Sequence, residues 1–150
     1  CCSYEEAEPY ISYEINRSRR YGNPLTFLYI TLIMPKETQD AIAMEDRAVR
    51  DLFRDQYDNQ VLRIFYNTIR TTDVLIDADG SYVIMMVNSP RENAEILINR
   101  LVDNFEKESA YRVSVGIAEF PKNGIIYQDL IDSAKQHMTD YSEIADEKAD

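Results

Sequence analysis

The chain has 150 residues, a mass of 17.5 kDa and a net charge of −11, and this length suits one domain because single cores usually extend over ~100–150 residues. Apolar residues make up 45% of the chain and charged residues 29%, so we expect a globular domain rather than a disordered chain or a coiled coil. The acidic balance argues against general affinity for nucleic acid or anionic membrane, because polyanions are repelled. It leaves room for one small anion held by local arginines.

Glycine and cysteine usage narrows the class of protein further. The four glycines lie too far apart for a dinucleotide-binding turn or a phosphate loop, which need closely spaced glycines. Cys1 and Cys2 are neighbours and His137 is the single histidine, so the sequence holds neither a disulfide framework nor a Cys/His metal site.

The sequence also lacks targeting signals. No apolar run approaches the ~20 residues of a membrane span, and the start lacks the basic and then apolar pattern of a signal peptide. We expect a cytoplasmic location and no membrane insertion by this segment. Because the chain begins with Cys rather than Met, we also expect a fragment of a longer protein, whose other parts could include a membrane anchor.

The first half of the chain predicts a helix, a strand and a long helix. Residues 4–21 carry Ile11 and Ile15 at helical spacing, and residues 25–34 form a nearly continuous apolar run that is typical of a buried strand. A helical pattern then extends from about residue 41 to 70, in which Asp58-Asn59 is a candidate for a break. Its expected core positions are Ile42, Val49, Phe53, Leu62, Phe65 and Ile69.

The second half predicts a hairpin, a helix, a strand and a last helix. Two strand-like runs, residues 74–78 and 81–87, flank Asp79-Gly80, a pair that favours a tight turn. A helix opens at Ser89-Pro90, residues 111–120 alternate as a strand, and a final helix begins near residue 127. This order predicts an α+β fold of the ferredoxin-like βαββαβ type in one domain, with an antiparallel sheet and helices on one of its faces.

Three stretches resemble a known family. Residues 16–30 contain an Arg-Tyr-Gly-x-Pro-Leu pattern, and residues 70–86 and 113–124 follow at matching distances. In this order and spacing they resemble the GGDEF domain of bacterial diguanylate cyclases, over essentially the whole chain. The resemblance implies the nucleotidyl cyclase-like version of the fold and a part in bacterial signal transduction, such as the regulation of biofilm formation or motility.

The departures from this family concern catalysis. Active members join two GTP molecules into cyclic di-GMP with metal ions that carboxylates hold. The resemblance places the first of these carboxylates at Thr31, with its acidic companion at Ile33, and the GGDEF signature at residues 79–83. The second metal carboxylate becomes Ser81 and the acidic residue after it becomes Tyr82. Hydroxyls are poor ligands for hard cations, so a metal site is not expected.

Other catalytic parts of the family are missing as well. The segments that read guanine have no counterpart in residues 35–47, and the phosphate-contacting lysine aligns with Ser142. The resemblance therefore implies a degenerate, inactive domain without catalytic residues, metal or cofactor.

One site of the family is retained. An Arg-x-x-Asp motif five residues ahead of the signature binds the product, cyclic di-GMP, as an intercalated dimer, and here Arg70 and Asp73 hold that position. A further arginine of the family's site matches Arg100. The guanidinium groups would meet guanine edges or phosphate oxygens bidentately, and Asp73 would accept from a guanine N–H.

The motif alone is weak evidence, because Arg100 and Asp103 fit it too and an ion pair three residues apart on a helix explains either case. We expect a receptor for cyclic di-GMP that relays occupancy to a neighbouring domain or protein of its signalling system. A ligand-free dimerisation or protein-interaction module is the alternative, which leaves a homodimer open. A residual diguanylate cyclase is a third reading.

Overall fold

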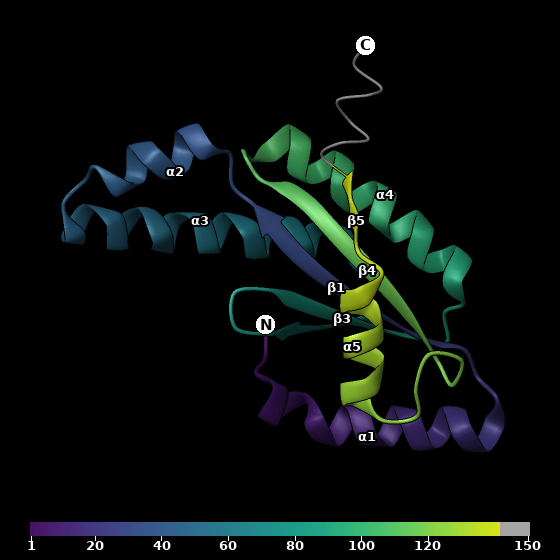
Figure 1. Cartoon of the computed structure of the whole chain (residues 1–150). Coiled ribbons are helices and arrows are strands. Elements are labelled where there is room, and N and C mark those ends of the chain that lie inside the picture. Colours follow the sequence, from purple (N-terminus) through teal and green to yellow (C-terminus); the bar gives the residue numbers. More distant parts are fainter. Residues whose placement is uncertain (142–150) are drawn as a thin grey trace, which may run out of the picture.

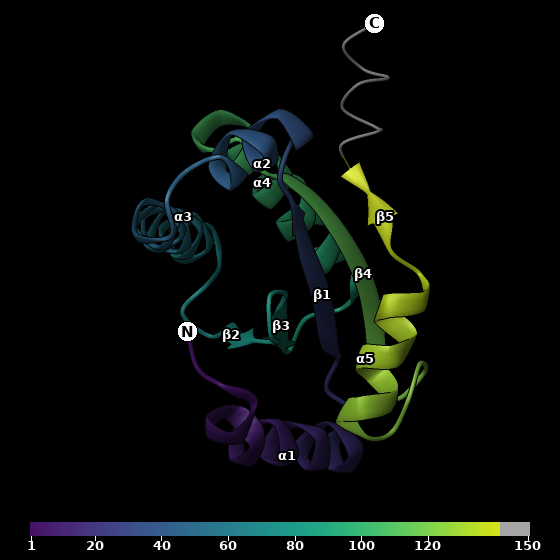
Figure 2. The same cartoon turned by 60° about the vertical axis from the view of Figure 1, so that its left-hand side comes forward.

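The computed structural model describes residues 1–141. Its helices pack around one antiparallel sheet (Figures 1 and 2). The sheet has the strand order β2-β3-β1-β4-β5. Its strands are β1 (Leu25–Ile33), β2 (Val74–Asp77), β3 (Tyr82–Val87), β4 (Arg112–Phe120) and β5 (Thr139–Asp140). The helices are α1 (Tyr4–Tyr21), α2 (Lys36–Ala43), α3 (Arg47–Thr68), α4 (Arg91–Glu108) and α5 (Tyr127–Gln136). The predicted α+β order is confirmed.

Strand β1 lies in the middle of the sheet because its side chains are apolar on both faces. Leu28 and Ile30 belong to a core cluster with α3 and α4, whereas Leu25 and Phe27 belong to a second cluster with α1 and α5. Helices therefore cover both faces of the sheet, and the expectation of helices on one face is wrong. The continuous apolar run of β1 indicates that both faces of the sheet are covered, since a strand with one solvated face alternates between apolar and polar residues.

The long helix expected over residues 41–70 is two helices, and this expectation is also wrong. The chain breaks at residues 44–46, not at Asp58-Asn59, which lie inside α3, and the polar residues after Pro35 already form α2. The pair α2 and α3 projects from the sheet as an arm (Figure 1). Phe53 is exposed on this arm, because α3 has buried residues only from Val61 onward.

The predicted hairpin turn is confirmed. Asp79 and Gly80 have φ angles of 51° and 92°, the positive values that a two-residue turn of this kind requires. The flanking residues close the turn, since the Ala78 N–H donates to the Ser81 carbonyl oxygen at 2.9 Å.

None of the helices among residues 1–141 is long and apolar enough to cross a membrane.

Strand β4 packs so closely against α5 that only glycine fits at one position. A Cβ atom on Gly116 would lie 1.9 Å from the carbonyl oxygen of Ala134. Since the obstacle is backbone, it cannot turn away as a flexible side chain would.

We therefore expect Gly116→Ala to lower the free energy of unfolding by about 1–3 kcal/mol or more, the usual cost of overpacking. The measurement is urea unfolding followed by circular dichroism. Gly22→Ala is the matched control, because a Cβ there meets no atom within 4 Å and costs only the left-handed backbone strain of about 1 kcal/mol. Equal losses in the two variants would contradict the close packing of β4 on α5.

Candidate functional site

The candidate site lies where α3 ends and the chain turns into β2. Asp73 and Arg70 close this turn, since the Asp73 N–H donates to the Arg70 carbonyl oxygen at 3.1 Å. The Asp73 side chain is 0% exposed, whereas that of Arg70 is 44% exposed. The pair is thus held by a turn after the helix and not by the helix spacing that the simpler explanation assumed.

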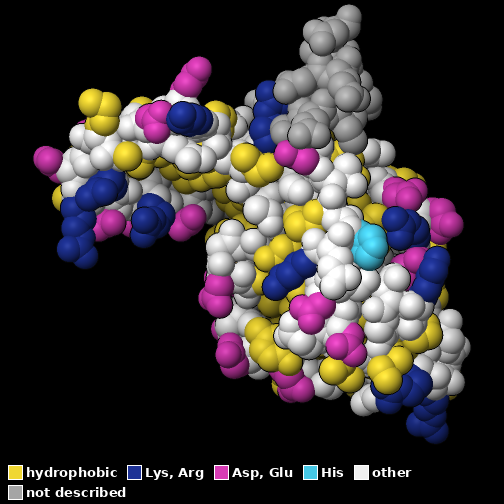
Figure 3. Space-filling view, viewed as in Figure 1, with side chains coloured by type: hydrophobic (Ala, Val, Ile, Leu, Met, Phe, Trp, Pro, Cys, Tyr) yellow, Lys and Arg dark blue, Asp and Glu magenta, His cyan; other side chains and the backbone are white. Residues whose placement is uncertain are grey.

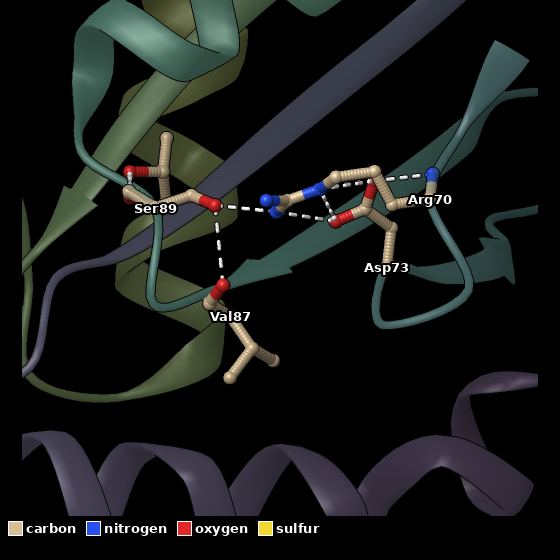
Figure 4. A network of polar contacts seen from close by, with 5 residues as sticks. Arg70, Asp73, Val87 and Ser89 are labelled. Atoms are coloured by element: carbon tan, nitrogen blue, oxygen red, sulfur yellow. Dashed lines mark hydrogen bonds and ion pairs between the residues drawn. The ribbon is translucent and has the colours of Figure 1, made fainter.

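The carboxylate of Asp73 receives several hydrogen bonds from Arg70 (Figure 4). The backbone N–H of Arg70 donates to Asp73 Oδ2 at 2.9 Å, and its guanidinium Nη2 donates to Oδ1 at 2.9 Å. The Arg70 Nε lies 3.3 Å from Oδ1. A buried carboxylate needs such partners, because removing an unpaired charge from water is costly. Because the Asp73 side chain has no exposed surface, a guanine N–H could reach it only if Arg70 moved.

Ser89 is a third member of this network, although its sequence pattern predicted only the start of a helix. Its Oγ accepts a hydrogen bond from Arg70 Nη2 and donates to the Val87 carbonyl oxygen at 3.1 Å (Figure 4). The backbone of Ser89 is held by two hydrogen bonds. Thr26 Oγ1 of β1 donates to the Ser89 carbonyl oxygen at 2.7 Å, and the Ser89 N–H donates to the carbonyl oxygen of Pro24, just before β1. Ser89 therefore orients the guanidinium of Arg70.

Arg100 approaches the same place from α4. Arg70, Asp73 and Arg100 line one depression of about 140 Å³, with an apolar floor that includes Met86 and Leu97. Within residues 1–141, Arg100 has no ion-pair or hydrogen-bond partner, and its predicted alternative partner Asp103 does not pair with it. The volume is below the ~300–1,000 Å³ of pockets that enclose a ligand, so a nucleotide would lie over the depression.

The positions that the family resemblance assigns to metal carboxylates are also neighbours. Thr31 Oγ1 and Ser81 Oγ lie 3.2 Å apart and form a hydrogen bond between β1 and the hairpin. Two hydroxyls that bond each other do not fit a divalent cation, which takes charged oxygen ligands. The described residues contain no group of three or more His, Cys, Asp or Glu that could hold a metal ion. Ser142, the position of the phosphate-contacting lysine, lies outside the described residues.

Tyr82 follows Ser81, at the position that the family resemblance assigns to an acidic residue of the signature. Its ring lies 4.9 Å from that of Phe65, at the edge of the core. Burial, and then the negative charges of Asp58 and Asp77, raise the pKa of its hydroxyl above the usual 10.0. The group is therefore neutral at physiological pH and supplies no negative charge at this position.

The fold is that of GGDEF domains. No protein-family model and no curated protein matches the chain. Among solved structures it is similar to the GGDEF domain of YfiN (TpbB) from Pseudomonas aeruginosa, with a TM-score of 0.70 and 15% identity over 89% of this chain and 85% of that one. It is also similar to a DGC protein from Thermotoga maritima, with a TM-score of 0.68 and 13% identity over 92% and 95% of the two chains.

A third similar structure is a microbial GGDEF domain with its own mode of interaction with cyclic di-GMP. Its TM-score is 0.69 and its identity 18%, over 89% of this chain and 82% of that one. At such identities the likeness concerns the fold alone.

The buried charge of Asp73 makes a prediction about stability. We expect Arg70→Ala to lower the free energy of unfolding by about 1–3 kcal/mol, because it leaves a buried carboxylate without its charged partner. The double variant Arg70→Ala/Asp73→Ala should be more stable than Arg70→Ala alone, since it removes the orphaned charge. Urea unfolding of Arg70→Ala, of Asp73→Ala and of the double variant measures this coupling. Additive effects would show that the ion pair contributes nothing beyond its parts.

Proposed function

We propose that this chain is a non-catalytic GGDEF-like signalling domain that binds cyclic di-GMP at Arg70, Asp73 and Arg100 and relays occupancy to a neighbouring domain or protein. The observation that carries this proposal is the convergence of two arginines from separate elements on one depression. A solved GGDEF domain of the same fold interacts with this dinucleotide, which supports the choice of ligand.

The chemistry of the depression suits a dinucleotide. Guanidinium groups bind phosphate oxygens and the O6 and N7 acceptors of guanine with paired N–H donors. Arg70 is already oriented by Asp73 and Ser89, so less conformational entropy is lost when a ligand binds. In this proposal Asp73 acts by positioning Arg70, and Arg100 supplies the uncompensated charge.

The net charge of −11 does not oppose such a site. Charges that lie beyond the Debye length of ~8 Å at physiological ionic strength are largely screened. The residues that line the depression carry two positive charges and one negative charge, so the local balance favours an anion.

The proposed lack of activity has separate support. Phosphoryl transfer in the family depends on metal ions that bridge the reacting oxygens, and Thr31 and Ser81 offer two hydroxyls in their place. Without that cation the charge that develops on the leaving group is not stabilised.

Calorimetry with cyclic di-GMP tests the binding. We expect the wild type to bind with a Kd of about tens of micromolar or tighter, and Arg100→Ala to weaken binding about tenfold or more, because a hydrogen bond to a charged group contributes ~1.5–3 kcal/mol. Arg100 is the variant of choice since it has no partner within the described chain whose loss would affect folding. Arg20→Ala on α1 is the control. The proposal fails if the wild type does not bind or if Arg100→Ala binds equally well.

The second candidate is a ligand-free dimerisation or interaction module. It is favoured by one observation, that Arg70 already satisfies both oxygens of Asp73, so the pair needs no ligand to explain it. This candidate predicts that cyclic di-GMP leaves the Tm of the wild type unchanged, and that Arg100→Ala retains its oligomeric state in analytical ultracentrifugation.

A turnover assay tests the third reading, residual cyclase activity. We expect no cyclic di-GMP from GTP with Mg²⁺ or Mn²⁺, and no Mn²⁺ binding by the wild type in paramagnetic resonance. The variant Thr31→Asp/Ser81→Asp should bind Mn²⁺, because it places two carboxylates where two hydroxyls lie 3.2 Å apart. Formation of cyclic di-GMP by the wild type would show that the domain has cyclase activity.

A further inference from the structure

Helix α1 has an exposed aromatic side in addition to the face that it buries. Its inner face packs Ala7, Ile11 and Ile15 into one cluster with the sheet and α5. Among the elements of residues 1–141, none covers the outer side of the helix, which lies at one edge of the molecule (Figures 1 and 2). On that side Tyr10 and Tyr13 are 66% and 62% exposed. Tyrosine is enriched in interfaces between proteins, so this side of α1 is a candidate contact surface.

A stripe of five residues follows this side, and we call it the outer stripe: Glu6, Tyr10, Tyr13, Arg17 and Arg20. They are spaced by four, three, four and three residues, the alternation that keeps side chains on one side of a helix over several turns. All five are exposed or half-buried. The stripe is acidic at its start, aromatic in its middle and basic at its end. The whole helix has this polarity, with acidic side chains toward its start and basic side chains toward its end (Figure 3).

The charges of the outer stripe have an explanation within one chain, but its tyrosines do not. The helix dipole stabilises acidic groups near the start of a helix and basic groups near its end, and Glu6 completes a capping box with Ser3. A tyrosine ring in water contributes to neither effect and leaves apolar surface exposed. Among the described residues no carboxylate pairs with Arg20, whose guanidinium lies 5.5 Å from the ring centroid of Tyr21. Arg20 is therefore available to an acidic group of another molecule.

We infer that the outer stripe binds the outer stripe of a second copy of this chain, with the two α1 helices antiparallel about a twofold axis at Tyr13. In this arrangement Glu6 meets the partner's Arg20 at both ends of the interface. Tyr10 lies against the partner's Arg17, a pairing of a cation with an aromatic ring. A twofold interface uses the same patch on both copies, so a patch with opposite charges at its two ends is self-complementary when the helices are antiparallel. A parallel pair would place like charges opposite each other.

The interface is small, so we expect a reversible dimer and not a permanent one. A helix of 18 residues is about 27 Å long, and a contact between two helix faces of this length belongs with the interfaces below ~1,200 Å² that are typical of transient complexes. Exposed ion pairs contribute little affinity alone, and burial of the tyrosine rings supplies the rest. The surface is separate from the proposed cyclic di-GMP site, because the described residues that line the depression at Arg70 include none from α1.

Analytical ultracentrifugation of the whole chain tests the inference. Over about 10–500 µM we expect the wild type to show a reversible monomer–dimer equilibrium. Arg20→Glu and Glu6→Lys should each weaken dimerisation about tenfold or more, because each change places like charges at both ends of a twofold interface. An equimolar mixture of the two variants should dimerise as well as the wild type, since both end contacts then join opposite charges. This recovery would also show that the lost capping box in Glu6→Lys is not the cause of the weaker dimer.

A substitution at the axis tests the same surface independently. Tyr13→Arg places two like charges at the twofold axis and should abolish dimerisation, whereas Leu52→Arg, at a 60% exposed position of the arm, should retain it. A wild type that stays monomeric, as for a stripe that binds a different protein, overturns the inference. A mixture that stays monomeric overturns it too, as does a dimer that persists in Tyr13→Arg, which would use another surface. Arg100→Ala should leave the dimer unchanged whether or not it binds cyclic di-GMP, so this inference and the proposed function fail separately.

Discussion

The burial of β1 on both faces is the constraint from which the rest of the structure follows. Phe27 and Leu28 are both fully buried, although they point to opposite sides of the sheet. A strand of this kind must lie between neighbours and under helices on each side, because any open face would leave apolar surface in water. It also positions the candidate site, since Thr26 of β1 holds the backbone of Ser89.

The buried carboxylate of Asp73 explains why contacts within the protein hold Arg70 in one orientation. A charge with no exposed surface needs donors from the protein, and Arg70 supplies them from its backbone and its side chain. The same contacts suit a structural ion pair and a prepared binding site, so the pair does not distinguish a receptor from an interaction module. Arg100 is the residue on which the two candidates make different predictions, because it lines the same depression and has no ion-pair partner among the described residues.

Local patterns in the sequence predicted the elements whose formation depends on neighbouring residues. Helix α1 has the predicted bounds and β1 nearly so, and the Asp79-Gly80 hairpin has the expected positive φ angles. The break between α2 and α3 was misplaced because residues 44–46 contain no glycine or proline. Phe53 was misassigned to the core because helical periodicity shows that a helix has an apolar face, but not whether the sheet extends far enough to cover it.

The candidate site was predictable only in part, for a related reason. The resemblance placed Arg70, Asp73 and Arg100 in one site, and the structure brings all three to one depression. Ser89 carried no signal, because its role depends on a guanidinium that reaches it from another loop.

The net charge predicts how this protein encounters large polyanions better than it predicts the charge at a single binding site. A total of −11 governs encounters with large polyanions, whose many charges sense the whole surface. A small ligand senses the groups within a Debye length of ~8 Å, and at the depression these include two arginines, Arg70 and Arg100, and one carboxylate, Asp73. Several arginines of this acidic chain have no ion-pair partner among the described residues, so it is the place of Arg100 in the depression beside Arg70 that leaves its charge available to a ligand.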